Sequence, residues 1–167
     1  MKKTQILDWP AIQQKTRRMA HQIVEDDFED KEIVIIGIKE GGFEFARMLE
    51  AEIRAISSIK TSLISLSLSK KDPSGSPIAL ETGTQTLDQK TVLLVDDVAN
   101  TGRTMYYALK PIMEFSPCKV QIAVLVDRQH KLFPIASDFV GLSLSTTLQE
   151  HITVVLDGTS PAHAYLH

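Results

Sequence analysis

A strand-length apolar run that ends in two adjacent acids constrains this chain more than any other feature of its sequence. Residues 91–95 (TVLLV) precede Asp96 and Asp97, and a Thr-Gly-Arg-Thr turn at 101–104 then leads into a helical pattern over 105–110. This order of strand, loop and helix predicts one unit of an open α/β sheet. The chain has 167 residues, 43% of them hydrophobic, which is enough to bury the core of one domain.

The same stretch predicts a ligand site. Ligands of open α/β sheets gather at the carboxyl ends of the strands, and a loop that enters a helix presents unpaired N–H groups to an anion. Asp96 and Asp97 would repel a bare phosphate, so the expected ligand places hydroxyls or a divalent cation at the acids and its phosphate at the turn. A ribose phosphate has this layout. In the alternative interpretation, the acids only close a buried strand and the turn only starts a helix.

The segment from Val95 to Thr104 (VDDVANTGRT) resembles the signature of the type I phosphoribosyltransferases. The resemblance implies a three-layer α/β fold with a parallel, Rossmann-like sheet, a small hood and a flexible loop, all in one domain spanning 1–167. It also implies a glycosyltransferase activity in which Asp96 and Asp97 are the catalytic acids. These acids would face the ribose hydroxyls of phosphoribosyl pyrophosphate and, directly or through water, a Mg²⁺ cofactor. The residues implied to bind phosphoribosyl pyrophosphate here are Asp96, Asp97, Val98, Ala99, Asn100, Thr101, Gly102, Arg103 and Thr104.

A second strand-loop-helix unit lies upstream. Residues 32–38 are uniformly apolar, which suits a central parallel strand, and residues 43–56 carry apolar side chains at helical spacing. Between them, Gly41 and Gly42 by themselves indicate a tight turn. The resemblance assigns Lys39, Glu40, Gly41 and Gly42 to the loop that binds pyrophosphate. Family members often carry Arg or Lys, a small residue and Gly here, so Glu40 departs from the pattern and leaves open a scaffold that has lost its ligand.

A long polar segment follows the strand predicted over 61–68. Residues 69–77 are rich in Ser, Pro and Gly, and loops of this length are either functional lids or disordered. The resemblance places the flexible loop at about 68–87. Such a lid would exclude water from a reactive sugar and bring Lys70 or Lys71 to the pyrophosphate. A surface hairpin with solvated lysines is the alternative.

The last third of the chain resembles one branch of the family, the pyrimidine-operon attenuation regulators that are also uracil phosphoribosyltransferases. The resemblance rests on 127–130 (DRQH), which follows a predicted strand at 120–126, and on 133–141 (FPIASDFVG). It implies a hood at about 127–150, uracil as the base, and Asp127 and Arg128 as base-binding residues. Asn100 stands where purine-specific members carry an acid, which also favours uracil. Residues 134–147 are expected to be mostly irregular, and 152–156 to close the chain as a strand.

Composition sets the expected partners and location. No apolar run approaches the roughly 20 residues that span a bilayer, so no membrane contact and a cytoplasmic location are predicted. Cys118 is the single cysteine and cannot form an internal disulfide. The branch implies a homo-oligomer, dimer or tetramer, and RNA binding as an alternative function, through Arg17, Arg18 and His21. The net charge of −3 predicts that such binding is weak.

Overall fold

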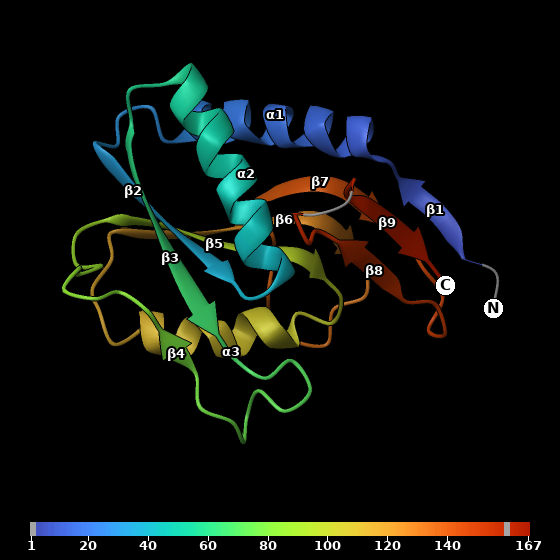
Figure 1. The fold of residues 1–167 in the computed structure, drawn as a ribbon. Coiled ribbons are helices and arrows are strands. Elements are labelled where there is room, and N and C mark those ends of the chain that lie inside the picture. The colour runs from blue at the N-terminus through green and yellow to red at the C-terminus, as the bar shows by residue number, and fades with distance from the viewer. Residues whose placement is uncertain (1–2, 159–160) are drawn as a thin grey trace.

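The computed structural model describes residues 3–158 and 161–167 (Figure 1). Its centre is a six-stranded sheet in the order β4-β3-β2-β5-β6-β7, in which only the β3–β4 pair is antiparallel. The predicted parallel α/β sheet is therefore confirmed. The strands are β2 Glu32–Ile38, β3 Lys60–Ser67, β4 Ala79–Leu80, β5 Thr91–Ala99, β6 Lys119–Arg128 and β7 Phe139–Leu144.

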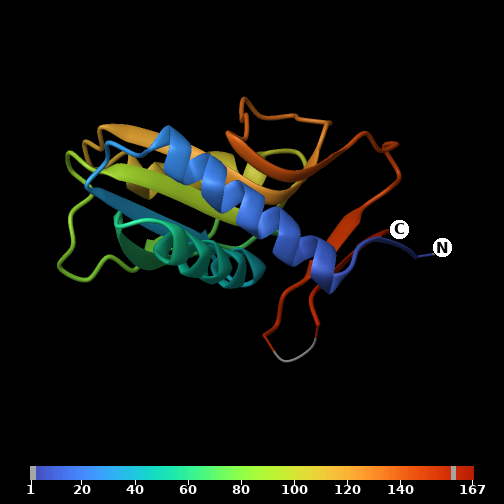
Figure 2. The same ribbon diagram turned by 90° about the horizontal axis from the view of Figure 1, so that it is seen from above.

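Helices cover both faces of this sheet. The helices α1 (Trp9–Asp26) and α2 (Gly41–Ile56) lie on one face and α3 (Arg103–Ile112) lies on the other (Figures 1 and 2). The apolar side chains of β2 alternate between two cores: Ile33 and Ile35 pack with α1 and α2, whereas Val34 and Ile36 pack with α3. A strand that is buried on both faces explains the uniformly apolar sequence of 32–38.

A second, antiparallel sheet of three strands joins the two ends of the chain (Figure 1). It contains β1 (Thr4–Leu7), β9 (His163–Leu166) and β8 (Ile152–Val155), in that order. The strand predicted at 152–156 is present, but it does not close the chain, because β9 follows it. Each of these strands has four residues, too few to show a clear sequence period.

The region 127–150 contributes to the main sheet. Its first residues complete β6, and β7 extends the sheet as a further parallel strand beside β6. The expectation that 134–147 is mostly irregular is therefore wrong over 139–144. Gly141 weakens the strand signal in the sequence, but its lack of a side chain is required: a Cβ there would lie 3.1 Å from Leu125 Cδ1 and overlap the Leu125 carbonyl oxygen.

The predicted flexible loop, 68–87, contains β4 as its single regular element within the described chain. β4 pairs with β3 through Leu66 and Leu80. Residues 68–78 therefore leave the sheet and return to its edge. Across residues 3–158 and 161–167, no helix has the length and apolar character needed to cross a bilayer.

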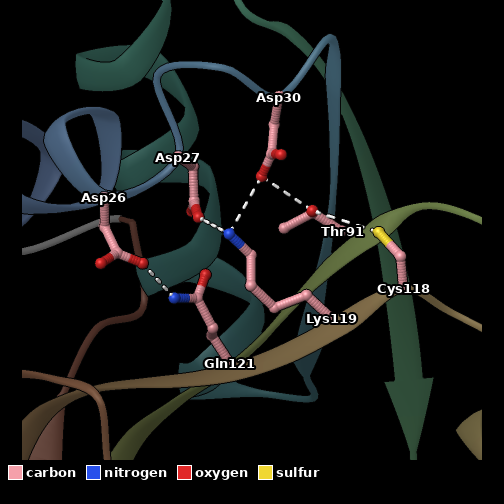
Figure 3. Close-up of polar contacts among 7 residues, drawn as sticks. All are labelled: Asp26, Asp27, Asp30, Thr91, Cys118, Lys119 and Gln121. Atoms are coloured by element: carbon pink, nitrogen blue, oxygen red, sulfur yellow. Dashed lines mark hydrogen bonds and ion pairs between the residues drawn. The ribbon is translucent and has the colours of Figure 1, made fainter.

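Asp27, Asp30 and Lys119 form an ion-pair cluster at the amino edge of the sheet, which we call the amino-edge cluster. Lys119 Nζ contacts the Asp27 carboxylate and lies 3.1 Å from Asp30 Oδ2. The side chain of Asp27 is fully buried. The Thr91 hydroxyl of β5 donates to Asp30, and Lys119 itself belongs to β6, so the cluster joins the segment after α1 to two strands. Figure 3 draws these contacts among Asp26, Asp27, Asp30, Thr91, Cys118, Lys119 and Gln121.

Candidate active site

Asp96 and Asp97 lie near the carboxyl end of β5, in the middle of the main sheet. Asp96 is 2% exposed and Asp97 is 7% exposed. The Asp97 N–H donates to Asp96 Oδ1 at 3.0 Å, and the Val98 N–H donates to Asp97 Oδ1 at 2.9 Å. Burial and the neighbouring Asp97 carboxyl raise the pKa of Asp96 well above its usual value, although Lys70 opposes the shift. Two acids this close and this buried need a cationic or hydrogen-bonding partner.

The paired glycines make room for these acids. A Cβ on Gly41 would overlap the Asp97 carboxylate. A Cβ on Gly42 would lie 2.7 Å from Asp96 Oδ1 and 2.9 Å from both Asp96 Cα and the Val95 carbonyl oxygen. The start of α2 therefore packs directly on the end of β5, and this close approach accounts for the Gly-Gly pair better than a tight turn does.

The turn at 101–104 is held in place by hydrogen bonds from the segment after β6. Gly102 has φ +83°, a left-handed conformation that disfavours other residues, and α3 begins at the next residue. The N–H groups of Leu132 and Phe133 donate to the Thr101 carbonyl at 2.9 and 3.1 Å. The Arg103 N–H donates to the Thr101 hydroxyl at 3.4 Å, Gly102 at the N-cap offers no capping side chain, and the first turn of α3 has no acid. The N–H groups of that turn can therefore bind an anion.

Two cavities adjoin the acid pair, one at Asp96 and the other at Asp97. The first, about 320 Å³, is lined by Lys70, Asp96 and residues 98–105. The second, about 530 Å³, is lined by 39–41, Asp97 and part of β8, among others. The Lys39–Glu40 peptide bond is cis, and the Glu40 side chain is exposed. The structure thus brings together the acids, the turn and the Lys39–Gly42 loop, which the sequence predicted as separate parts of one site.

Lys70 joins Asp96 and Asp97, and we call these three residues the carboxyl-edge cluster. Its Nζ lies 3.0 Å from Asp96 Oδ1 and 3.5 Å from Asp97 Oδ1. Burial lowers the pKa of Lys70 and the two carboxylates raise it, with a net upward shift. The sequence predicts that Lys70 or Lys71 of the flexible loop reaches the pyrophosphate, whereas the structure places Lys70 on the acid pair, in the cavity beside the turn at 101–104. Sequence alone does not distinguish the two neighbours.

The predicted base-binding residues lie at the end of β6, beside the site. Asp127 pairs in register with Ala99 of β5, and its carboxylate accepts a hydrogen bond from Lys131. Arg128 is buried, and its guanidinium donates to the Thr146 hydroxyl and, at 2.6 Å, to the Thr147 carbonyl. The Arg128 side chain thus supports residues 146–147, so its direct contact with a base stays a prediction.

The residues predicted for RNA lie on α1, away from this site. Arg17 forms an ion pair with Glu52 at 3.5 Å. Arg18 donates to the carbonyl oxygens of Val140 and Gly141, at 3.0 and 2.7 Å, and thereby ties α1 to β7. His21 is exposed. Two of the three side chains therefore already make contacts within the protein.

Comparisons with known proteins agree with this geometry. The family model "Phosphoribosyl transferase domain" matches residues 2–157. The bifunctional protein PyrR of Geobacter sulfurreducens is 36% identical over 164 residues, which cover 94% of this chain and 93% of that protein. The bifunctional protein PyrR of Brevibacillus brevis is 38% identical over 161 residues, covering 92% and 90%.

Solved structures show the same fold. The hypoxanthine phosphoribosyltransferase of Trypanosoma cruzi matches with a TM-score of 0.77 at 18% identity, covering 96% of this chain and 95% of that one. A hypoxanthine-guanine phosphoribosyltransferase of Bacillus anthracis matches with a TM-score of 0.73 at 23% identity, covering 89% and 84%. The chain belongs to the phosphoribosyltransferase family and is similar to PyrR proteins over nearly its whole length.

Proposed function

We propose that this chain transfers ribose 5-phosphate from phosphoribosyl pyrophosphate to uracil, giving UMP and pyrophosphate. The position of Asp96 and Asp97 between two cavities carries the proposal. One cavity adjoins the turn at the start of α3, and the other adjoins the Lys39–Gly42 loop. This arrangement suits a ligand with a phosphate at one end, a pyrophosphate at the other and ribose hydroxyls between them.

The residues have separate roles in the transfer. When the bond between ribose C1 and pyrophosphate breaks, its electron pair leaves with pyrophosphate and positive charge builds on the ring. Asp96 and Asp97 hold the hydroxyls and stabilise that charge, while the turn at 101–104 holds the 5-phosphate. Lys39 and the adjacent N–H groups receive the leaving group. Uracil N1 forms the new bond to C1 and releases its proton, and the protein supplies no covalent nucleophile.

The acid pair also fits Mg²⁺. Carboxylate oxygens are ligands that Mg²⁺ prefers, and the ammonium group of Lys70 already marks a cation position beside both acids. Among the described residues, no group of three or more His, Cys, Asp or Glu side chains surrounds a metal position. Water and the pyrophosphate group would therefore supply the remaining ligands of the ion. When bound, it neutralises charge on the leaving group.

The choice of base rests on the similarity to PyrR proteins and on Asn100, whereas the solved structures named above are of purine enzymes. The decisive experiment measures pyrophosphate release with uracil, hypoxanthine, guanine, adenine and orotate as acceptors. We expect release with uracil to exceed that with each purine. Preferred use of a purine base would contradict the uracil assignment, and no release with any base would contradict the transferase proposal.

A second candidate function is RNA binding through α1, together with assembly into a dimer or tetramer. Arg17 and Arg18 are engaged within the protein and the net charge is −3, so we propose weak hairpin binding with a shallow salt dependence. Filter binding tests this with an attenuator-type hairpin, with and without UMP, and with Arg18→Ala. Tight, UMP-enhanced binding at physiological salt would overturn the proposal. Assembly into a dimer or tetramer is a separate proposal, and light scattering tests it by measuring the oligomeric state.

A further inference from the structure

The loop that leaves β3 places a lysine where a ligand cation would lie. Lys70 Nζ is 3.0 Å from Asp96 Oδ1 and 3.5 Å from Asp97 Oδ1, and Lys70 lines the cavity beside the turn at 101–104. The Asp96 side chain is only 2% exposed, so a charged carboxylate there needs a nearby cation. Lys70 supplies that cation from within the chain.

The returning end of the same loop places an acid on the lysine of the Lys39–Gly42 loop. Glu81 Oε1 lies 3.1 Å from Lys39 Nζ. The other oxygen of Glu81 accepts a hydrogen bond from the Ser65 hydroxyl, and the Glu81 N–H donates to the Ser65 carbonyl at 3.0 Å. Glu81 is thus fixed against β3, and it engages the side chain that we assign to the pyrophosphate.

These two contacts have opposite polarity, and together they match the charges of the ligand. Magnesium pyrophosphate offers a divalent cation to the acids and anionic oxygens to Lys39. The loop offers an ammonium group to the same acids and a carboxylate to the same lysine. Lys70 therefore offers the acids the positive charge that the metal would offer, and Glu81 offers Lys39 the negative charge that pyrophosphate would offer.

We propose that residues 70–81 form a latch in which Lys70 and Glu81 take the places of the metal and the pyrophosphate, so that magnesium pyrophosphate binds by displacing both. The inference rests on the assignment of this site under the proposed function. It adds two residues, Lys70 and Glu81, that set ligand affinity by competing with the ligand.

The structure also limits the strength of the latch. The side chains of Lys39 and Glu81 are 41% and 57% exposed, and ion pairs this exposed contribute little stability. Residues 70–78 contain no helix or strand, and Asp72 makes only local hydrogen bonds, to Ser69, Ser74 and Gly75. The two ion pairs can therefore open without breaking the main sheet, although Pro73 is buried and Ile78 packs against the core on the α3 face. The ligand needs to overcome only a modest competition.

The test measures binding of Mn²⁺ alone, by electron paramagnetic resonance, and of magnesium pyrophosphate, by calorimetry. For Lys70→Met we expect Mn²⁺ affinity to rise about threefold to tenfold, because a competing cation is gone. For Glu81→Gln we expect pyrophosphate affinity to rise about twofold to fivefold, because Lys39 is released. Lys71→Met and Glu25→Gln are matched controls at exposed positions, and both should bind as the unaltered protein does.

Two further measurements keep the test decisive. Lys70→Arg retains the cation and should keep the original Mn²⁺ affinity, and amide exchange over 70–78 should be faster in Lys70→Met than in the unaltered protein. Unchanged or weaker Mn²⁺ binding by Lys70→Met, unchanged exchange, or unchanged or weaker pyrophosphate binding by Glu81→Gln would each overturn the latch. Neither binding assay uses a base or phosphoribosyl pyrophosphate, so failure of uracil transfer is a separate result.

Discussion

A lysine between two aspartates occurs at both edges of the main sheet, with different consequences. In the carboxyl-edge cluster the lysine comes from a loop without regular structure, and the acids face cavities. In the amino-edge cluster the lysine belongs to β6, and one acid is fully buried at the end of α1 (Figure 3). The same three charges therefore form an exchangeable site at one edge and a fixed structural tie at the other. What decides between the two is the backbone that carries the lysine, because Asp30 of the amino-edge cluster also lines a cavity, of about 400 Å³.

The largest expected difference between the clusters is in catalysis. Asp97→Asn should lower turnover on the order of 10²-fold or more, because it removes a charge that faces the reacting ribose. Asp30→Asn, in the amino-edge cluster, should leave turnover unchanged. Pyrophosphate release measures both variants, and circular dichroism checks their folds. Equal activity in the two variants would remove the functional distinction between the edges.

The next difference concerns threonine hydroxyls. Thr104→Val should weaken phosphoribosyl pyrophosphate binding by about 1–3 kcal/mol, since a phosphate oxygen loses its donor in a partly buried site. Thr91→Val should leave that affinity unchanged, because the Thr91 hydroxyl donates to Asp30 at 2.8 Å, far from the ligand. Calorimetric titration gives both affinities. An unaltered affinity in Thr104→Val would move the phosphate away from the turn.

Loss of the lysine should affect stability more at the amino edge. Lys119→Met leaves the fully buried Asp27 carboxyl without its cation and should lower the free energy of unfolding by about 1–3 kcal/mol. Lys70→Met should lower it by less than about 1 kcal/mol, because Lys70 belongs to a loop without regular structure, whereas Lys119 belongs to β6. Urea unfolding compares the two. A larger loss in Lys70→Met would contradict the structural role that we give the amino-edge cluster.

The smallest expected effect is on the pH dependence of stability. Burial raises the pKa of Asp27 in the folded protein, although Lys119 opposes the shift. The folded state then holds a proton that the unfolded chain has released, so the free energy of unfolding falls as pH rises from the ordinary value of 3.8. Asp96 has the same sign and a larger shift, so its contribution extends to higher pH.

Removing each carboxyl separates the two contributions. Asp27→Asn should flatten the lower part of this slope and Asp96→Asn the upper part, as urea unfolding between about pH 4 and pH 7 would show. A slope that both variants leave unchanged would mean that neither acid titrates differently on folding.

Local sequence was sufficient wherever one segment carries its own signal. The apolar runs of 32–38 and 91–95 and the helical spacing of 43–56 each predicted the element that the structure contains, although β5 continues through the acid pair to Ala99. The short turn before α3 was likewise visible, because Gly102 and its neighbours specify a conformation within a few residues. These features depend on near neighbours in the chain, so the sequence determined them by itself.

Tertiary structure decided everything that depends on partners distant in sequence. β7 forms although Gly141 lies in its middle, because it pairs with β6 and Arg18 of α1 binds its carbonyl groups. The small sheet unites both ends of the chain through β1 and β9. Lys70 rather than Lys71 reaches the acids because the path of the loop points one of two adjacent side chains inward, and a local pattern of charge does not encode that direction.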